Sequence, residues 1–142
     1  NIEELMELLD INIDNDFNKL RDEALTGNKV NTNELLSKTV IEAEKNIYYL
    51  SVINTRLNKL YQINQYNNDI SIENRVENIK PPIFWKDKPK VINQAKKWKN
   101  GKIKNMLRKT FDLEKKIKSN NVINKELLIR KLILDICHTA NA

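Results

Sequence analysis

Apolar side chains recur along most of the chain at spacings of three and four residues, and strand-like alternation of apolar and polar positions is nearly absent. That spacing is the period of a helix with one buried face. A length of 142 residues fits one domain. We therefore predict an all-α protein, a bundle of five to seven helices.

The first half of the chain is predicted to hold five helices, separated by polar residues and one glycine. They cover about 2–9, 14–26, 32–43, 46–65 and 71–79. Asp14 or Asn15 is the expected cap of the second helix, and Gly27 is expected to end it because glycine readily adopts a positive φ. The predicted inward positions include Phe17, Leu20, Leu35, Leu36, Val40, Ala43, Ile47, Leu50, Ile53, Leu57, Leu60 and Tyr61.

The helical pattern stops at Pro81 and Pro82, because proline pushes the residue before it out of the helical region. Residues 80–86 are thus predicted to form a connector with two large aromatic side chains, Phe84 and Trp85. Asp87 is the expected cap of the next helix, with Pro89 in its first turn. Further helices are predicted over about 88–99, 100–119 and 125–137, with a loop at Asn120 and Asn121. Their predicted inward positions include Val91, Ile92, Ala95, Trp98, Ile103, Met106, Leu107, Phe111, Leu113 and Ile117.

The composition argues against catalysis by this chain. Two glycines cannot build a Walker A loop or a dinucleotide-binding turn, and one cysteine with one histidine cannot complete a zinc site. Cys137 and His138 are neighbours on a predicted helix, where adjacent side chains point about 100° apart and make a poor nucleophile–base pair. We expect both to be structural. We therefore predict no catalytic, cofactor-binding or metal-binding residues.

Basic and acidic residues are divided unevenly between the two halves. Residues 1–71 hold 7 basic and 12 acidic side chains, whereas residues 72–142 hold 18 basic and 7 acidic ones. Segment 86–118 alone holds 13 basic and 3 acidic residues. Such a division points to an anionic partner for the second half. A solvated surface in a lysine-rich protein is the alternative interpretation.

Four stretches, in order, resemble the C-terminal half of the delta subunit family of the bacterial DNA polymerase III clamp loader. They are NIEELMELL at 1–9, FNKLRDEALTGN at 17–28, IKPPIFWKDKPKVINQAKKW at 79–98 and LEKKIKS at 113–119. The third stretch is similar to the family's connector, two prolines followed by aromatics and a lysine, and to the basic helix ending in tryptophan that follows it.

The resemblance implies a scaffolding domain. In that family the C-terminal helical bundle joins the gamma/tau and delta-prime subunits in a five-membered collar. ATP hydrolysis belongs to gamma/tau, and an N-terminal module opens the sliding clamp. We accordingly expect 1–12 to be a remnant of a preceding lid domain and 13–142 to be the collar domain. The first residue is not Met, so we expect a piece of a longer protein, whose missing N-terminal part would bind the sliding clamp.

The expected setting is the bacterial cytoplasm. No apolar run is long enough to span a membrane, and no secretion leader is seen. The expected partners are gamma/tau, delta-prime and, in the assembled complex, primed DNA, with no membrane.

The resemblance and the charge pattern together select the candidate site residues. The candidate DNA-facing residues are Trp85, Lys86, Lys88, Lys96, Lys97 and Lys99. Trp85 would stack on a template base, and the alternative is that Phe84 and Trp85 fill the bundle core. Trp98 is expected in the core. The candidate subunit-interface residues are Leu128, Leu132 and Ile136, on a last helix that is apolar nearly all round.

The sequence leaves two alternatives to the collar domain. One is a stand-alone helical nucleic-acid-binding module that uses the basic segment 86–118. The other is an enzyme domain, which the lack of a nucleophile–base pair or metal set disfavours.

Overall fold

The computed structural model describes residues 1–65, 69–119 and 123–142. These residues form seven α helices and one short 3-10 helix with no strand, so the predicted all-α bundle is confirmed. The elements are α1 (Ile2–Thr26), α2 (Lys29–Lys38), η1 (Ala43–Lys45), α3 (Asn46–Asn64), α4 (Ile72–Asn78), α5 (Lys88–Lys97), α6 (Asn100–Ser119) and α7 (Lys125–Ala140). The predicted loop at Asn120 and Asn121 lies outside the described residues.

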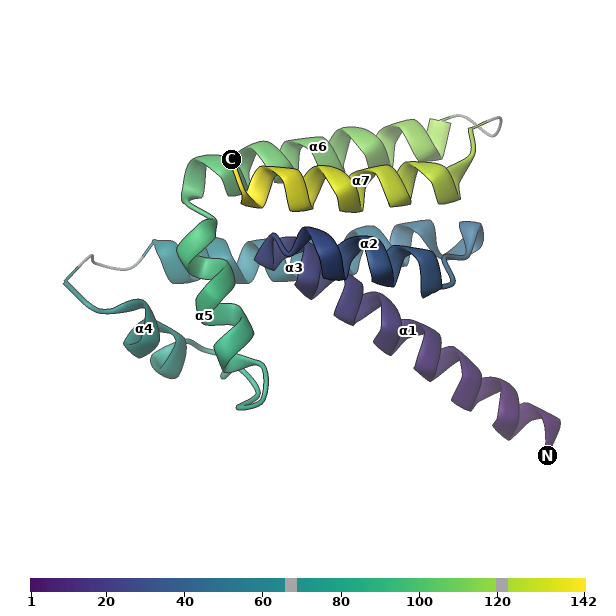
Figure 1. Cartoon of the computed structure of the whole chain (residues 1–142), viewed down its shortest axis with the longest axis horizontal. Helices are drawn as coiled ribbons and strands as arrows, with labels where there is room; N and C mark the ends of the chain where they lie inside the picture. Colours follow the sequence, from purple (N-terminus) through teal and green to yellow (C-terminus); the bar gives the residue numbers. More distant parts are fainter. Residues whose placement is uncertain (66–68, 120–122) are drawn as a thin grey trace.

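The helices pack in an open bundle with one projecting element. α6 and α7 lie side by side above α3 (Figure 1), and α3 packs mainly on α6. The inner half of α1 packs on α7 and on α2, while α5 contacts α1, α3 and α4. The outer half of α1 leaves the bundle (Figure 1), and residues 1–12 are all exposed. We call residues 2–13 the arm.

α1 ends at Gly27, as predicted. Gly27 adopts a left-handed φ of 77°, and a Cβ there would lie 2.8 Å from Oδ1 of Asn141. The Asn141 amide donates to the carbonyl of Gly27 at 2.8 Å, so the first long helix is tied to the last residues of α7. Asn28 then caps α2, because its side chain accepts from the backbone N–H of Asn31 at 3.0 Å.

The predicted break between residues 9 and 14 is wrong, because α1 continues through it. The segment holds polar residues but neither proline nor glycine, so nothing in it stops a helix. The predicted helix over 32–43 begins earlier and ends at Lys38, where Arg130 donates to the carbonyls of Leu36 and Thr39. Val40, predicted to face inward, is therefore exposed, and Ala43 lies in η1.

Four further local predictions are corrected. Ile47 is exposed because the buried side of α3 carries Tyr49 instead. Phe111 is exposed because the buried residues of α6 lie on a different side of that helix. Asp87 begins α5 but makes no capping hydrogen bond, although Pro89 does lie in the first turn. Asn100 lies within α6 rather than capping it, and its buried side-chain oxygen has no hydrogen-bond partner among the described residues.

The core is built around Trp98, as predicted. Its indole is fully buried and donates from Nε1 to the carbonyl of Leu25 at 2.8 Å. Phe17 and Tyr49 stack nearby with ring centroids 4.3 Å apart. These aromatic side chains join α1, α3 and the end of α5 into one apolar cluster.

A buried polar network joins the same three helices. Oδ1 of Asp22 accepts from Arg21 Nη2 at 3.0 Å and from Arg56 Nη1 at 3.0 Å. Gln94 accepts from Arg56 at 3.0 Å and donates to the backbone carbonyl of Asp22 at 3.2 Å. Since α1, α3 and α5 each contribute a member, the network sets the angles between them.

Replacing Asp22 by Ala is expected to destabilise the fold strongly. The change leaves two mostly buried guanidinium groups without their shared carboxylate, and breaking such a pair costs about 3–5 kcal/mol. Urea unfolding followed by circular dichroism measures the change. Asp112→Ala, at an exposed position on α6, is the control and should shift the free energy of unfolding by less than about 0.5 kcal/mol. A loss below about 1 kcal/mol for Asp22→Ala would show that the network is not needed.

Candidate functional site

The connector before α5 is held by α3 and closed by its own backbone. Lys59 Nζ donates to the carbonyl of Pro81, and Gln62 Nε2 donates to that of Lys80, each at 3.3 Å. The peptide bond between Lys80 and Pro81 is cis. The N–H of Asp87 donates to the carbonyl of Phe84 at 2.9 Å, which closes a turn. The tip of this turn is therefore presented outward on a supported backbone.

Phe84 and Trp85 lie in this turn, and both side chains are mostly exposed, although Phe84 also lines a hollow beside Arg56. Their exposed fractions are 58% and 67%, and their ring centroids are 5.9 Å apart. Lys86 Nζ lies 5.4 Å from the centroid of the Trp85 ring, within the range of a cation–π contact. The alternative in which these two aromatics fill the core is therefore wrong.

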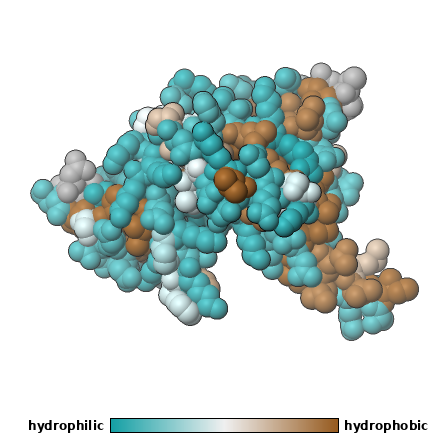
Figure 2. Space-filling view, in the orientation of Figure 1, coloured by the Kyte–Doolittle hydropathy of each residue, from teal (hydrophilic) through white to brown (hydrophobic). Residues whose placement is uncertain are grey.

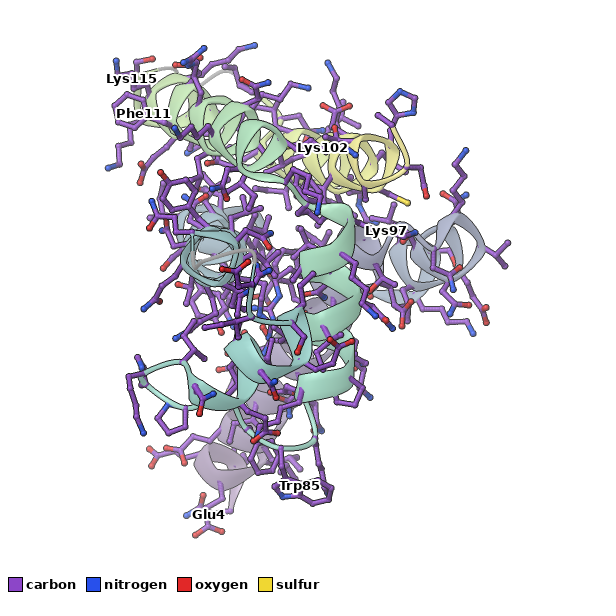
Figure 3. All side chains as sticks on the ribbon, turned by 90° about the vertical axis from the view of Figure 1, so that its left-hand side faces the viewer. Glu4, Trp85, Lys97, Lys102, Phe111 and Lys115 are labelled. Carbon is purple, nitrogen blue, oxygen red and sulfur yellow. The ribbon has the colours of Figure 1, made fainter. Side chains whose placement is uncertain are left out.

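The candidate lysines do not form one surface with Trp85. Lys86 and Lys88 flank the start of α5, whereas Lys96, Lys97 and Lys99 lie at its end. Ten helical residues span about 15 Å, and Figure 3 shows Trp85 and Lys97 at opposite ends of the helix. The sequence placed these residues in one segment, but the length of α5 separates them into two groups.

Several of these lysines already have partners. Lys88 bonds Glu77 at 2.9 Å, and Lys96 bonds Glu73 at 3.2 Å. The pKa of Glu73 lies below its ordinary value because its carboxylate accepts from its own backbone N–H and from Lys96. Lys97 donates to Oδ1 of Asn141 at 3.4 Å. The basic segment is thus partly neutralised from within the chain.

Sequence reasoning missed a second exposed aromatic–cation pair. Lys115 Nζ lies 4.6 Å from the centroid of the Phe111 ring, on the outer side of α6 (Figure 3). The spacing of four residues on a helix was the available signal. Phe111 was instead assigned to the core because it continues an apolar stripe.

Two of the three subunit-interface candidates are corrected. Leu132 and Ile136 are buried, because they lie on the sides of α7 that α1, α2, α3 and α6 cover, whereas Leu127 and Leu134 of the same helix are exposed. Leu132 and Ile136 therefore present no surface to a neighbouring subunit. Leu128 is half-buried and is the one member of the set that reaches the surface.

An exposed apolar surface that sequence reasoning missed lies on the arm. Ile2, Leu5, Met6 and Leu9 form a stripe with exposed fractions of 76%, 62%, 65% and 58%. Figure 2 shows this part of α1 as a projecting apolar surface. The 3–4 spacing identified these residues as one face of a helix, but a spacing alone does not tell whether a face has a partner within the chain.

Every charged residue of the arm is acidic: Glu3, Glu4, Glu7 and Asp10. Where the arm joins the bundle, Lys45 on η1 lies 3.4 Å from Asp14 and 3.8 Å from Asp10. Burial lowers the pKa of Lys45, but the nearby carboxylates outweigh this effect and raise it overall. The arm therefore combines an exposed apolar stripe with an entirely negative set of charged side chains.

The described residues contain no cluster of His, Cys, Asp and Glu that could hold a metal ion. Among the helices in the described ranges, none has the length and apolarity needed to cross a bilayer. Cys137 is a buried free cysteine.

Comparison with family models, curated proteins and solved structures finds no match to this chain.

The two tryptophans are expected to differ sharply in fluorescence. Trp85→Phe should leave the buried Trp98 as the only indole, with blue-shifted emission that acrylamide quenches weakly. The free energy of unfolding should change by less than about 0.5 kcal/mol, as for other exposed sites. Strong quenching of the remaining emission would contradict the buried position of Trp98. A marked loss of stability in Trp85→Phe would show that Trp85 packs in the core.

Proposed function

We propose that this chain is a non-catalytic oligomerisation domain that serves as the collar domain of a clamp loader delta subunit. The observation that supports this most directly is the exposed apolar stripe of the arm. A helix with one apolar stripe normally buries it, and an exposed stripe of this kind marks a binding surface. In this proposal the arm binds a neighbouring gamma/tau or delta-prime subunit.

The charges of the arm define the kind of surface that it would bind. At about 100° per residue, Glu3 and Asp10 lie beside one edge of the stripe, which favours a partner with an apolar groove and a basic edge on that side. Pairing of two arms is opposed because each arm brings only negative charge to the contact. The proposal thus favours a neighbour of a different kind over self-association through the arm.

The same proposal gives the connector a second role, contact with primed DNA in the assembled complex. An exposed indole with a lysine over its ring can stack on an unpaired base, and such stacking typically contributes about 1–3 kcal/mol per base. The lysines at the start of α5 would attract the phosphates of the strand.

The second candidate function is a stand-alone nucleic-acid-binding module. Its support is the basic segment 86–118, whose side chains on α6 include the exposed Phe111–Lys115 pair. Salt-titrated binding to labelled single-stranded DNA separates the two functions. Micromolar affinity with a steep salt slope and no partner protein would favour the stand-alone module.

Leu5→Glu combined with Leu9→Glu is expected to abolish association with the gamma/tau and delta-prime subunits. The double change places charges in the middle of the stripe, at positions that make no core contact. A pull-down at micromolar concentrations, checked by sedimentation velocity, measures it. The free energy of unfolding should stay within about 0.5 kcal/mol of the parent.

Val30→Glu is the matched control, because Val30 is equally exposed but lies alone on α2. It should leave association unchanged. If the unaltered chain associates with neither subunit, or if the arm variant associates as well as the parent, the proposed role of the arm fails.

Trp85→Ala is expected to weaken DNA-dependent clamp loading while subunit assembly stays intact, because Trp85 makes no core contact. Loss of one base-stacking contact predicts a fall of about tenfold in affinity for primed DNA. Loading assays with the full-length protein in its complex measure this effect. Phe111→Ala, which removes the exposed ring on α6, is the comparison. Equal losses for both variants would argue for the stand-alone module instead.

A further inference from the structure

A polar hollow of about 410 Å³ lies in the angle between α1 and α5, where the space-filling view shows a notch (Figure 2). Its walls include Lys19 from α1, Arg56 from α3, and Asp87 and Lys90 from the start of α5. A second hollow of about 220 Å³ under the connector shares Arg21, Arg56 and Asp87 with the first. We call the two together the arginine groove.

Arg56 lines the groove, and three of the five N–H donors of its guanidinium have no acceptor in the described residues. Its side chain is only 12% exposed. Nη1 donates to Asp22 and to Gln94, but within the described parts of the chain no acceptor lies at Nε or Nη2. A guanidinium this deeply buried normally has partners for its N–H groups. Arg56 lines both hollows, and neither Nε nor Nη2 is among the fully buried atoms without a partner, so these donors reach solvent.

The charges around the groove do not balance. Asp22 is shared between Arg21 and Arg56, which leaves one net positive charge in the buried network. Burial lowers the pKa of Arg56, and the neighbouring Arg21 lowers it further; the charges of Asp22 and, to a smaller extent, Asp87 oppose this but do not outweigh it. An anion placed at the unused donors of Arg56 would offset both the burial of its charge and the repulsion from Arg21.

The groups along the rim are mostly positive as well. Lys19, Lys59 and Lys90 line the groove, and Asp87 is the one acidic group of its rim. The Asp87 carboxylate lies more than 4.0 Å from any cationic group in the described residues, so it does not pair with Arg56. The groove is therefore basic even when Asp87 is counted.

We propose that the arginine groove binds a phosphate group, held by Nε and Nη2 of Arg56 and surrounded by Lys59 and Lys90. A planar guanidinium edge matches two phosphate oxygens. A phosphate also presents further oxygens toward lysines from other directions, which a carboxylate does not. Free phosphate or the phosphodiester of a nucleic-acid strand supplies the same chemistry. The binding is independent of the proposed collar role.

Titration of the whole chain with inorganic phosphate, at constant ionic strength set by chloride, tests the site. The probe is the Nε–Hε resonance of Arg56 in nitrogen–proton correlation spectra. We expect a saturable shift of this resonance. Arg56→Lys keeps the positive charge but removes the planar guanidinium edge that can donate two parallel hydrogen bonds to a phosphate. The change should weaken phosphate binding about tenfold.

Two rim variants keep the test valid if Arg56→Lys does not fold. Lys90 is exposed and Asp87 half-buried, and neither side chain joins the buried network. Lys90→Gln should weaken phosphate binding severalfold, whereas Asp87→Asn should strengthen it severalfold because a competing negative charge is removed. Lys99→Gln, at the far end of α5, is the control and should have no effect.

Three results would overturn the proposal. They are no saturable shift of Arg56, an equal loss of binding in the Lys90→Gln and Lys99→Gln variants, or no effect of Asp87→Asn. A parallel titration with single-stranded oligothymidylate identifies the source of the phosphate. Displacement of inorganic phosphate from Arg56 by the oligonucleotide assigns the groove to a strand, and a shift with inorganic phosphate alone assigns it to a free anion. The readout is the resonance of Arg56 alone. If this resonance does not shift, the phosphate site is excluded, but the result does not bear on association of the arm with its partner subunits or on the collar proposal.

Discussion

One carboxylate oxygen fixes the relative positions of three helices. Oδ1 of Asp22 accepts from two arginines on α1 and α3, and Gln94 of α5 completes the network. The indole of Trp98 makes a parallel connection from the end of α5 to α1. Because α5 is held at both of these points, the connector before it emerges at a defined place. The exposure of Phe84 and Trp85 therefore follows from a buried polar contact several residues away.

Much of the helical fold follows from local rules in the sequence. Gly27 ends a helix, Pro89 lies in the first turn of one, and Trp98 is buried, all as the residue types predict. The continuous α1 could not be predicted from those rules, since Asp14 and Asn15 are good caps that also tolerate a helix interior. Whether an apolar stripe meets a partner is decided by other parts of the chain. The same 3–4 spacing is buried on α3 and exposed on the arm.

In the candidate site too, residue type follows from the local sequence, whereas exposure and proximity depend on how distant helices pack. Position in the sequence identified Trp85 and its neighbouring lysines, but the length of α5 separates Trp85 from Lys97. Leu132 and Ile136 were chosen for their apolar character, which their burial in the chain's own core explains. Arg21, Arg56 and Asp87 are far apart in the sequence, so no motif could bring them together; only the crossing of α1, α3 and α5 does so.

The unbroken course of α1 has a spatial consequence. Twenty-five helical residues form a rod about 37 Å long, and its inner half lies against α7 and Asn141 while its outer half stands free. The groove wall at Lys19 belongs to the same rod. The apolar stripe ends at Leu9, ten residues or about 15 Å along the same rod from Lys19. The tip of the arm and the groove therefore occupy separate places on one continuous helix, and a ligand at one leaves the other uncovered.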